Sequence, residues 1–225
     1  MQIDIVRGHH PPENPHGATV VIDVIRAFTT ACLAFRNQVR LIRPVATAED
    51  AFALKRQYPD AILVGEIDAL PIPGFDYGNS PWEIEQAPLH GKELIMRTTN
   101  GIAATLNARR SQQVLVAGLI NAEATVVWLK NQTFERVVLV ASHPTGDEDV
   151  ACAAYMRGML GGAGIPLADA VSRTRAASAA AKFLERRHPN LHPQDIDMAA
   201  SSLGKAGLVM AVSYEPDPLI HLLAG

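Results

Sequence analysis

Polar residues that could do chemistry stand directly after several apolar runs of the sequence. Asp23 follows "VVI", with Arg26 three residues later, and Glu66 follows "ILVG". The run "LIM" leads into "RTTNG", residues 97–101, and "LVA" leads into "SHPTGDED", which contains Asp149. If these runs are parallel strands, their carboxyl ends meet at the edge of the sheet where α/β proteins bind ligands. The sequence therefore predicts a polar crevice that combines acids with cations.

The turn "TTNG" has more polar groups than a simple turn needs. Thr98, Thr99, Asn100 and Gly101 separate an apolar run from a helical pattern, with Arg97 just before them. Backbone N–H groups at a helix N-terminus attract anions, and threonine hydroxyls add donors. A helix cap with a tight turn explains the same residues equally well. We therefore expect an anion-binding turn, a cap, or both.

Asp23 ends a strand whose other residues are mostly apolar. An acid that is nearly buried at such a position needs a partner. We expect a functional role for Asp23, with a salt bridge to Arg26 as the structural alternative.

Other polar residues fit helix caps. Asn121 is typical of an N-cap residue. Thr145 and Glu148 have the spacing of a capping box, as do Ser80 and Glu83. Capping therefore explains these positions without any chemistry.

Length and composition indicate a folded protein with a sizeable core. The chain has 225 residues, of which 48% are hydrophobic, and a net charge of −3. No basic block is present, which argues against non-specific nucleic-acid binding. Cys32 and Cys152 both fall in helical patterns, and neither a signal peptide nor a membrane span is indicated. We expect a soluble cytoplasmic protein.

Short β-branched runs alternate with helical patterns along the chain. This rhythm predicts a three-layer α/β/α sandwich with a mostly parallel or mixed sheet, in one domain over residues 1–225. The runs 2–8 and 207–214 are candidate edge strands, for which an antiparallel orientation is open. The other predicted strands are 18–23, 39–45, 61–66, 93–98, 113–119 and 136–142, and the predicted helices are 26–36, 47–57, 101–109, 121–131, 147–161 and 167–187.

Several common phosphatase and metal motifs are absent. "IDVIRA" lacks the second aspartate of haloacid-dehalogenase phosphatases, neither cysteine has an arginine six residues on, and no phosphate-binding P-loop sequence occurs. His9, His10 and His16 lie in one proline-rich loop, but their irregular spacing is a weak zinc signal.

The sequence resembles the 2-phosphosulfolactate phosphatase (ComB-like) family. The resemblance rests, in order, on "VVIDVIRAFTTA", "PVATAEDA", "LVGEIDALPIPGFDYGNSPWE", "RTTNGIAA", "VLVAGLINA" and "EDVACAAYMRG", and covers about residues 18–160. It implies a three-layer α/β/α fold and a magnesium-dependent acid phosphatase. The family's named reaction removes phosphate from 2-phosphosulfolactate on the route to coenzyme M.

The resemblance also implies roles for the polar residues. The turn from Thr98 to Gly101 would hold phosphoryl oxygens at a helix N-terminus. A magnesium ion would neutralise charge on the phosphoryl group and orient the attacking group. The implied metal ligands are Asp23, Glu66 and Asp149, the implied catalytic residues are Asp23, Arg26 and Asp149, and the implied substrate-binding residues are Arg97, Thr98, Thr99, Asn100, Gly101, Asn79 and Ser80.

The sequence departs from the family pattern in three places. It has "GEIDA" at 65–69 where "GERGG" is usual, Arg97 where a threonine is usual, and no Ser-His-Gly element in the last third. We expect that positive charge has moved from position 67 to Arg97, so that a phosphorylated hydroxy acid of different shape is preferred.

Two alternatives stay open: a non-catalytic protein that binds a phosphorylated metabolite, and an enzyme of another reaction using the same pocket. The expected partner is a small phosphomonoester, not a nucleic acid or a membrane, and a homodimer is left open.

Overall fold

The computed structural model describes residues 1–223 of the chain, and it is built around one mixed β-sheet. The strands follow the order β1-β8-β2-β7-β9-β10-β3-β6-β4-β5 across the sheet. Their bounds are Gln2–Arg7 (β1), Asn14–Ile22 (β2), Leu41–Pro44 (β3), Ile62–Ile67 (β4), Leu70–Pro71 (β5), Glu93–Arg97 (β6), Ser111–Ala117 (β7), Arg136–Ala141 (β8), Met210–Ser213 (β9) and Leu219–Leu222 (β10).

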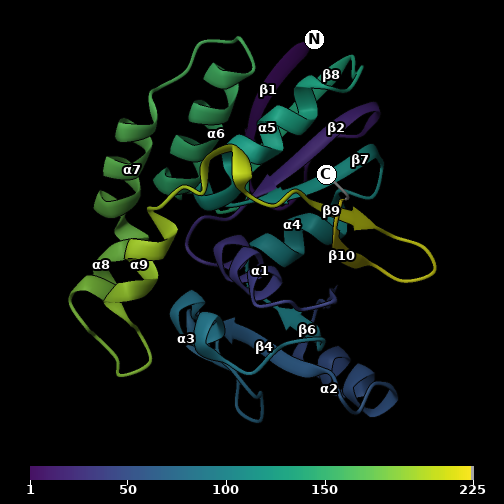
Figure 1. Ribbon diagram of the computed structural model, residues 1–225, viewed down its shortest axis with the longest axis vertical. Helices are drawn as coiled ribbons and strands as arrows, with labels where there is room; N and C mark the ends of the chain where they lie inside the picture. The colour runs from purple at the N-terminus through teal and green to yellow at the C-terminus, as the bar shows by residue number, and fades with distance from the viewer. Residues whose placement is uncertain (224–225) are drawn as a thin grey trace.

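Helices cover both faces of the sheet, as Figure 1 shows. Their bounds are Ala27–Arg36 (α1), Ala48–Gln57 (α2), Pro81–Gln86 (α3), Gly101–Asn107 (α4), Ala122–Lys130 (α5), Asp147–Met159 (α6), Leu167–Ala176 (α7), Ser178–Leu184 (α8) and Pro193–Ala199 (α9), with 3-10 turns at Leu119–Asn121 (η1) and Gly204–Ala206 (η2). Helices α1, α3 and α4 pack on one face, whereas α5 and α6 pack on the other face of β2 and β7. Helix α2 covers that other face over β4 and β6. The predicted three-layer sandwich is confirmed.

The alternation of side chains along the strands explains these layers. In β2, Val21 packs under α1 while Val20 and Ile22 face α5 and α6. Both faces of β2 are therefore buried, which accounts for its almost continuous apolar sequence.

The sheet contains two parallel blocks that run in opposite directions. Strands β1, β8, β2 and β7 are parallel to one another, as are β3, β6 and β4. Three antiparallel pairings, through β9 and β10, join the two blocks. Adjacent strands rotate by roughly 20–25°, so the five pairings between β2 and β6 accumulate a twist of more than about 100°. Because of this twist the carboxyl ends of the two blocks converge, and β2 and β4 both run toward the side of α8 and α9 (Figure 1).

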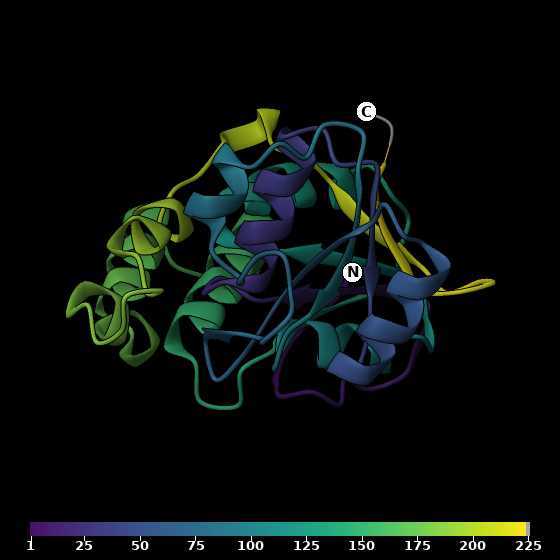
Figure 2. The same ribbon diagram turned by 90° about the horizontal axis from the view of Figure 1, so that it is seen from below.

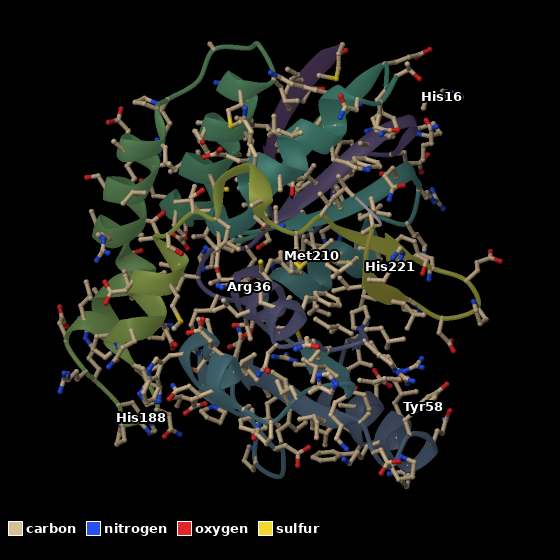
Figure 3. The ribbon with its side chains drawn as sticks, in the orientation of Figure 1. His16, Arg36, Tyr58, His188, Met210 and His221 are labelled. Carbon is tan, nitrogen blue, oxygen red and sulfur yellow. The ribbon has the colours of Figure 1, made fainter. Side chains whose placement is uncertain are left out.

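The prediction for the last apolar run was wrong in one respect. Strand β9 does run antiparallel, but it lies inside the sheet between β7 and β10 rather than at an edge. The sequence analysis missed β10, a short segment after two prolines, which pairs with both β9 and β3. Met210 of β9 is fully buried and lies at the centre of the molecule (Figure 3). Strand β1 is an edge strand as expected, but it is parallel to β8.

The predicted helix 167–187 is two helices. The backbone of Ala177 is extended, with φ −61° and ψ 144°, and separates α7 from α8. No glycine or proline marks this break in the sequence. Helices α7, α8 and α9 form a group on one side of the sheet, at the left in both Figure 1 and Figure 2. The sequence analysis did not predict α9.

Both cysteines are buried and free, Cys32 in α1 and Cys152 in α6. Within residues 1–223, no helix has both the length and the apolar character needed to cross a membrane.

Candidate active site

A cavity of about 320 Å³ lies where the carboxyl ends of the two strand blocks converge. Six segments of the chain form its wall: the β2–α1 junction, the β4–β5 turn, the segment before α3, the turn before α4, the β8–α6 loop, and α8 with the residues just after it. The lining residues are Asp23, Ile25, Arg26, Glu66, Asp68, Ala69, Asn79, Thr99, Asn100, His143, Gly146, Ser178, Ala179, Lys182, Phe183 and Arg187. The predicted polar crevice is present, and it combines acids with cations.

Asp23 is held by backbone N–H groups from two helices. Its Oδ1 accepts from the N–H of Ala27 at 2.9 Å, and its Oδ2 accepts from the N–H of Gly101 at 2.9 Å. Burial, together with the charges of Glu66 and Glu148, raises the pKa of Asp23 to about 7, against the lowering effect of these two donors. Asp23 therefore titrates near neutral pH in a fixed orientation.

The "TTNG" turn uses its donors on the protein's own acids. The N–H of Thr99 donates to Glu66 Oε1 at 2.7 Å, and the N–H of Gly101 donates to Asp23. The N–H of Ile102 donates to the Thr98 hydroxyl at 3.2 Å, so Thr98 acts as a cap. The turn therefore orients two carboxylates, those of Asp23 and Glu66.

Glu66 joins this turn to the β4–β5 turn. Its Oε2 accepts from the N–H of Ala69 at 2.6 Å. Asp68 and Ala69 have φ values of 53° and 71°, in the left-handed region that favours glycine. Glycine, which the resemblance implies at both positions, would adopt this backbone without the side-chain cost, whereas this chain has Asp-Ala there.

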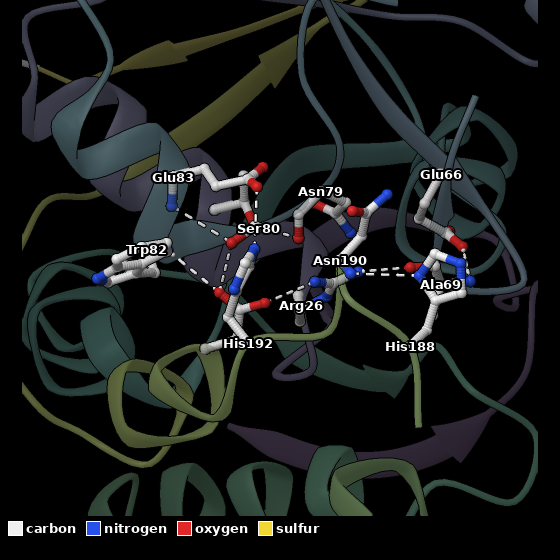
Figure 4. A network of polar contacts seen from close by, with 12 residues as sticks. Arg26, Glu66, Ala69, Asn79, Ser80, Trp82, Glu83, His188, Asn190 and His192 are labelled. Carbon is white, nitrogen blue, oxygen red and sulfur yellow. Dashed lines mark hydrogen bonds and ion pairs between the residues drawn. The ribbon is translucent and has the colours of Figure 1, made fainter. Parts of the chain in front are cut away.

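Arg26 lies in a buried network with α9, part of which is shown in Figure 4. Its guanidinium donates to Asp195 Oδ2 at 2.6 Å and to the carbonyl of Ala69 at 2.9 Å, and it lies 4.5 Å from the ring centroid of Phe183. The other Asp195 oxygen accepts from the Ser80 hydroxyl at 2.6 Å. The salt bridge of Arg26 is thus with Asp195 and not with Asp23.

Asp149 lies behind the cavity wall rather than on it. Its carboxylate accepts from the N–H of Val24 at 2.8 Å, the N–H of His143 at 3.1 Å and the Ser142 hydroxyl at 3.2 Å. Burial, together with the charge of Asp23, raises the pKa of Asp149 well above its usual range. These contacts tie the end of β8 to the end of β2, which is a positioning role.

Glu148 does not cap α6, contrary to the expected capping box. The N-cap residue is Gly146, without a side-chain cap, and Thr145 contacts His143 instead. Glu148 is buried, and its Oε2 has no hydrogen-bond partner within residues 1–223. Burial raises its pKa. Its other oxygen lies beside Gly146 of the cavity wall.

The remaining predicted residues fall into two groups. Asn79, Thr99 and Asn100 line the cavity, and the Oδ1 of Asn79 is buried without a partner in the described chain. Thr98, Gly101 and Ser80 lie behind the wall, Ser80 as the cap of α3.

Arg97 also lies off the cavity wall. Its guanidinium donates to the carbonyl of Glu66 at 2.6 Å. Ile67 is 45% exposed and is likewise absent from the lining. The cavity lining therefore gives no support to the expected transfer of pocket charge from position 67 to Arg97.

Asn121 is the N-cap residue of α5, but its side chain makes no cap. Its amide accepts from the N–H of Gly118 at 2.9 Å and donates to the carbonyl of Leu208 at 3.0 Å.

The sequence analysis missed the contribution of α8. Ser178, Lys182 and Phe183 line the cavity from this helix, and Arg187 lines it just beyond. The segment "SAAAKFLERR" resembles an ordinary surface helix in sequence. Its part in the site is visible only from its position beside the cavity in the folded protein. Asp195 was missed for the same reason.

The described residues contain no group of three or more His, Cys, Asp or Glu side chains arranged to hold a metal ion. His9 instead contacts Asn100 Oδ1 at 2.8 Å, and His16 is exposed at the outer end of β2 (Figure 3). The three histidines therefore do not form the zinc site that was considered.

Comparison with known proteins identifies the family. The 2-phosphosulpholactate phosphatase family matches residues 4–203. A probable 2-phosphosulfolactate phosphatase of Bacillus subtilis is 42% identical over 199 residues, which cover 87% of each chain. Proteins of the same description from Deinococcus radiodurans and Clostridium perfringens are 35% and 37% identical, over 65% and 61% of this chain and 60% and 58% of their own lengths. The chain belongs to the 2-phosphosulfolactate phosphatase family.

Proposed function

We propose that this protein is a phosphatase that hydrolyses the phosphate monoester of a small hydroxy acid, with 2-phosphosulfolactate as the first substrate to test. The observation that carries the proposal is the meeting of Asp23, Glu66, Asn79, Thr99 and Asn100 on one cavity wall. All five lie in the segments that this chain shares with the family. The relatives' names and the family match support the same reaction.

We further propose Mg²⁺ as the cofactor, because the oxygens around the cavity suit it. Mg²⁺ prefers oxygen ligands and keeps several waters, so one or two carboxylates suffice. Asp23 and Glu66 supply carboxylates, and the buried Asn79 Oδ1 and Glu148 Oε2 lack donors within the described chain. Unpaired buried acceptors cost free energy, which a hydrated cation would offset. When bound, Mg²⁺ would neutralise charge on the phosphoryl oxygens.

Two aspartates of the chain, Asp23 and Asp149, would then have different roles in the reaction. Without the metal, Asp23 has a pKa of about 7; bound Mg²⁺ would keep its carboxylate ionised, so that it can accept a proton from an attacking water and return it to the leaving alkoxide. Each of its oxygens already accepts one backbone N–H, which fixes the carboxylate plane. Asp149 holds the ends of β2 and β8 together behind it and is proposed to position Asp23 rather than to bind the metal.

A phosphate-release assay tests this proposal. The purified protein is dialysed against EDTA and assayed on phosphorylated hydroxy acids with and without Mg²⁺. We expect Mg²⁺-dependent release of inorganic phosphate and its loss in Asp23→Asn. The exposed Asp60→Asn is the matched control. Full activity after EDTA dialysis would exclude the Mg²⁺ requirement.

The same assay separates the alternatives. A protein that only senses a phosphorylated metabolite would bind these esters without releasing phosphate. An enzyme of another reaction would transform the substrate without releasing phosphate to water.

A further inference from the structure

The cations on the cavity wall are not equally available to an anionic ligand. Arg26 is almost completely buried, and its guanidinium is engaged by Asp195, by the Ala69 carbonyl and by the Phe183 ring. Arg187 pairs with Glu185 at the surface, where both side chains are exposed. Arg26 therefore cannot meet a substrate without first giving up a partner, whereas Arg187 pairs through its Nε alone and keeps its terminal amino groups available at the surface.

Lys182 differs from both arginines. It lines the cavity from α8 and is half-buried, and it forms no hydrogen bond or ion pair with any residue in 1–223. Its ammonium group lies 5.7 Å from the centroid of the Phe183 ring. Burial and the charge of Arg26 lower the pKa of Lys182, because both make the charged ammonium form less favourable there.

The charges of three acids, Glu66, Asp68 and Glu148, act on Lys182 and oppose this lowering of its pKa, but none of these acids forms an ion pair with it within residues 1–223. Burial, His9 and Lys182 lower the pKa of His143, so its ring is neutral at pH 7 and supplies no second cation. Each Glu66 oxygen accepts one backbone N–H, from Ala69 or Thr99, and Glu66 makes no ion pair with Lys182. An anion that entered the cavity would thus find Lys182 as the one unpaired cation among the described lining residues.

We propose that Lys182 binds the second anionic group of the substrate, a carboxylate or sulfonate borne next to the phosphate ester, and so sets the preference for phosphorylated hydroxy acids. This inference rests on the proposed phosphatase function. The phosphate ester itself would lie against Asp23, Thr99 and Asn100, which come from other elements of the wall. Because Lys182 lies on α8, this part of recognition comes from a region outside the segments on which the family resemblance was first noticed.

The test uses two esters that differ only in the second charge: 2-phospholactate and its carboxyl methyl ester. Calorimetric binding and phosphate release are measured for the wild type, Lys182→Met and Lys182→Arg, with 2-phosphosulfolactate as a third compound. Lys130→Met, at an exposed lysine that ends α5, is the matched control. Melting temperatures establish that each variant is folded.

We expect Lys182→Met to weaken binding and kcat/KM at least about tenfold for the two compounds with a second anion, with most of the effect in KM. Values for the methyl ester should stay within about twofold of the wild type, and Lys182→Arg should retain most of the preference. Equal losses for acid and ester, or no loss for either, would overturn the assignment. Absence of phosphate release by the wild type would count against the phosphatase, while the binding titration would still decide the role of Lys182.

Discussion

The Arg26 guanidinium and the Asp195 carboxylate meet at 2.6 Å in the interior, joining residues that are 169 positions apart. Arg26 precedes α1 at the cavity wall, and Asp195 lies in the first turn of α9. The pair therefore fastens the group of helices α7–α9 to the strand ends that carry the proposed chemistry.

Breaking this pair should destabilise the protein strongly. Asp195→Ala leaves the Arg26 charge buried without its partner, which typically costs about 3–5 kcal/mol. We expect a loss of that size in urea unfolding. The control is Asp197→Ala, on the same helix α9. It breaks the exposed pair of Asp197 with Arg175 of α7 and should cost less than about 1 kcal/mol. Equal effects of the two substitutions would show that the buried pair does not hold α9.

We expect Asp149 to be needed for stability and Glu148 for activity. The sequence had suggested the reverse, with Glu148 in a helix cap and Asp149 in catalysis. Asp149→Ala removes the acceptor for three donors, two of them backbone N–H groups, so we expect a loss of more than about 2 kcal/mol in stability. Glu148→Gln should lose phosphate release without any loss of stability, because it removes the carboxylate beside the cavity and, with it, the cost of ionising a buried acid. Thr145→Ala, which removes no cap, should change neither. Unchanged stability in Asp149→Ala would restore the original assignment.

The sequence indicated the polar ends of β2, β4 and β6 because each apolar run is closely followed by charged or hydroxyl residues. It could not indicate how these ends meet, since that depends on β9 and β10 entering the middle of the sheet. Strand pairing between segments that are distant in the sequence, such as β7 with β9 and β3 with β10, leaves no local pattern. The same limit hid Lys182 and Asp195, whose surroundings are set by the break at Ala177 and by long-range packing.

Gly101→Ala should disturb Asp23 directly. A Cβ at this position would lie 2.7 Å from Asp23 Oδ2 and 3.0 Å from the Cβ of Ala27, so the carboxylate must move. We expect phosphate release to fall by more than about tenfold, in line with the cost of misplacing a catalytic group. Ala103→Gly on the same helix is the control, since it costs about 1 kcal/mol of helix stability without meeting Asp23. A Gly101→Ala protein with normal turnover would show that the orientation of Asp23 is not critical.

Glycine should be favourable in the β4–β5 turn. Asp68 and Ala69 both have positive φ, a conformation that costs a residue with a side chain roughly 1–2 kcal/mol. Part of the gain from glycine is lost through the greater freedom of the unfolded chain. We therefore expect Ala69→Gly to raise the free energy of unfolding by about 0.5–1 kcal/mol. Ala48→Gly, at the first position of α2, should lower it, and a destabilised Ala69→Gly would argue against the observed turn.

Stability in the absence of divalent cations should fall as the pH rises from about 4 to about 7. Burial raises the pKa of Asp23 from 3.8 to about 7, so the folded protein binds more protons than the unfolded chain in that window. Glu148 and Asp149, whose pKa values are also raised, act in the same direction. The lowered pKa of His143 acts in the opposite direction below about pH 6.5, because the unfolded chain then binds the extra proton.

The Asp23 contribution is isolated by comparing the wild type with Asp23→Asn in EDTA between pH 4.5 and 8. One pKa unit corresponds to about 1.4 kcal/mol, and each kcal/mol shifts the melting temperature of a chain this size by about 2–4 °C. We expect the wild type to lose several degrees relative to Asp23→Asn as the pH rises from 4.5 to about 7. Added Mg²⁺ should remove most of that loss in the wild type, because a bound cation stabilises the ionised carboxylate, and it should have little effect on Asp23→Asn. If the melting temperatures of the two proteins change with pH in parallel, Asp23 is ionised throughout the range, and the raised pKa of Asp23 would have to be abandoned.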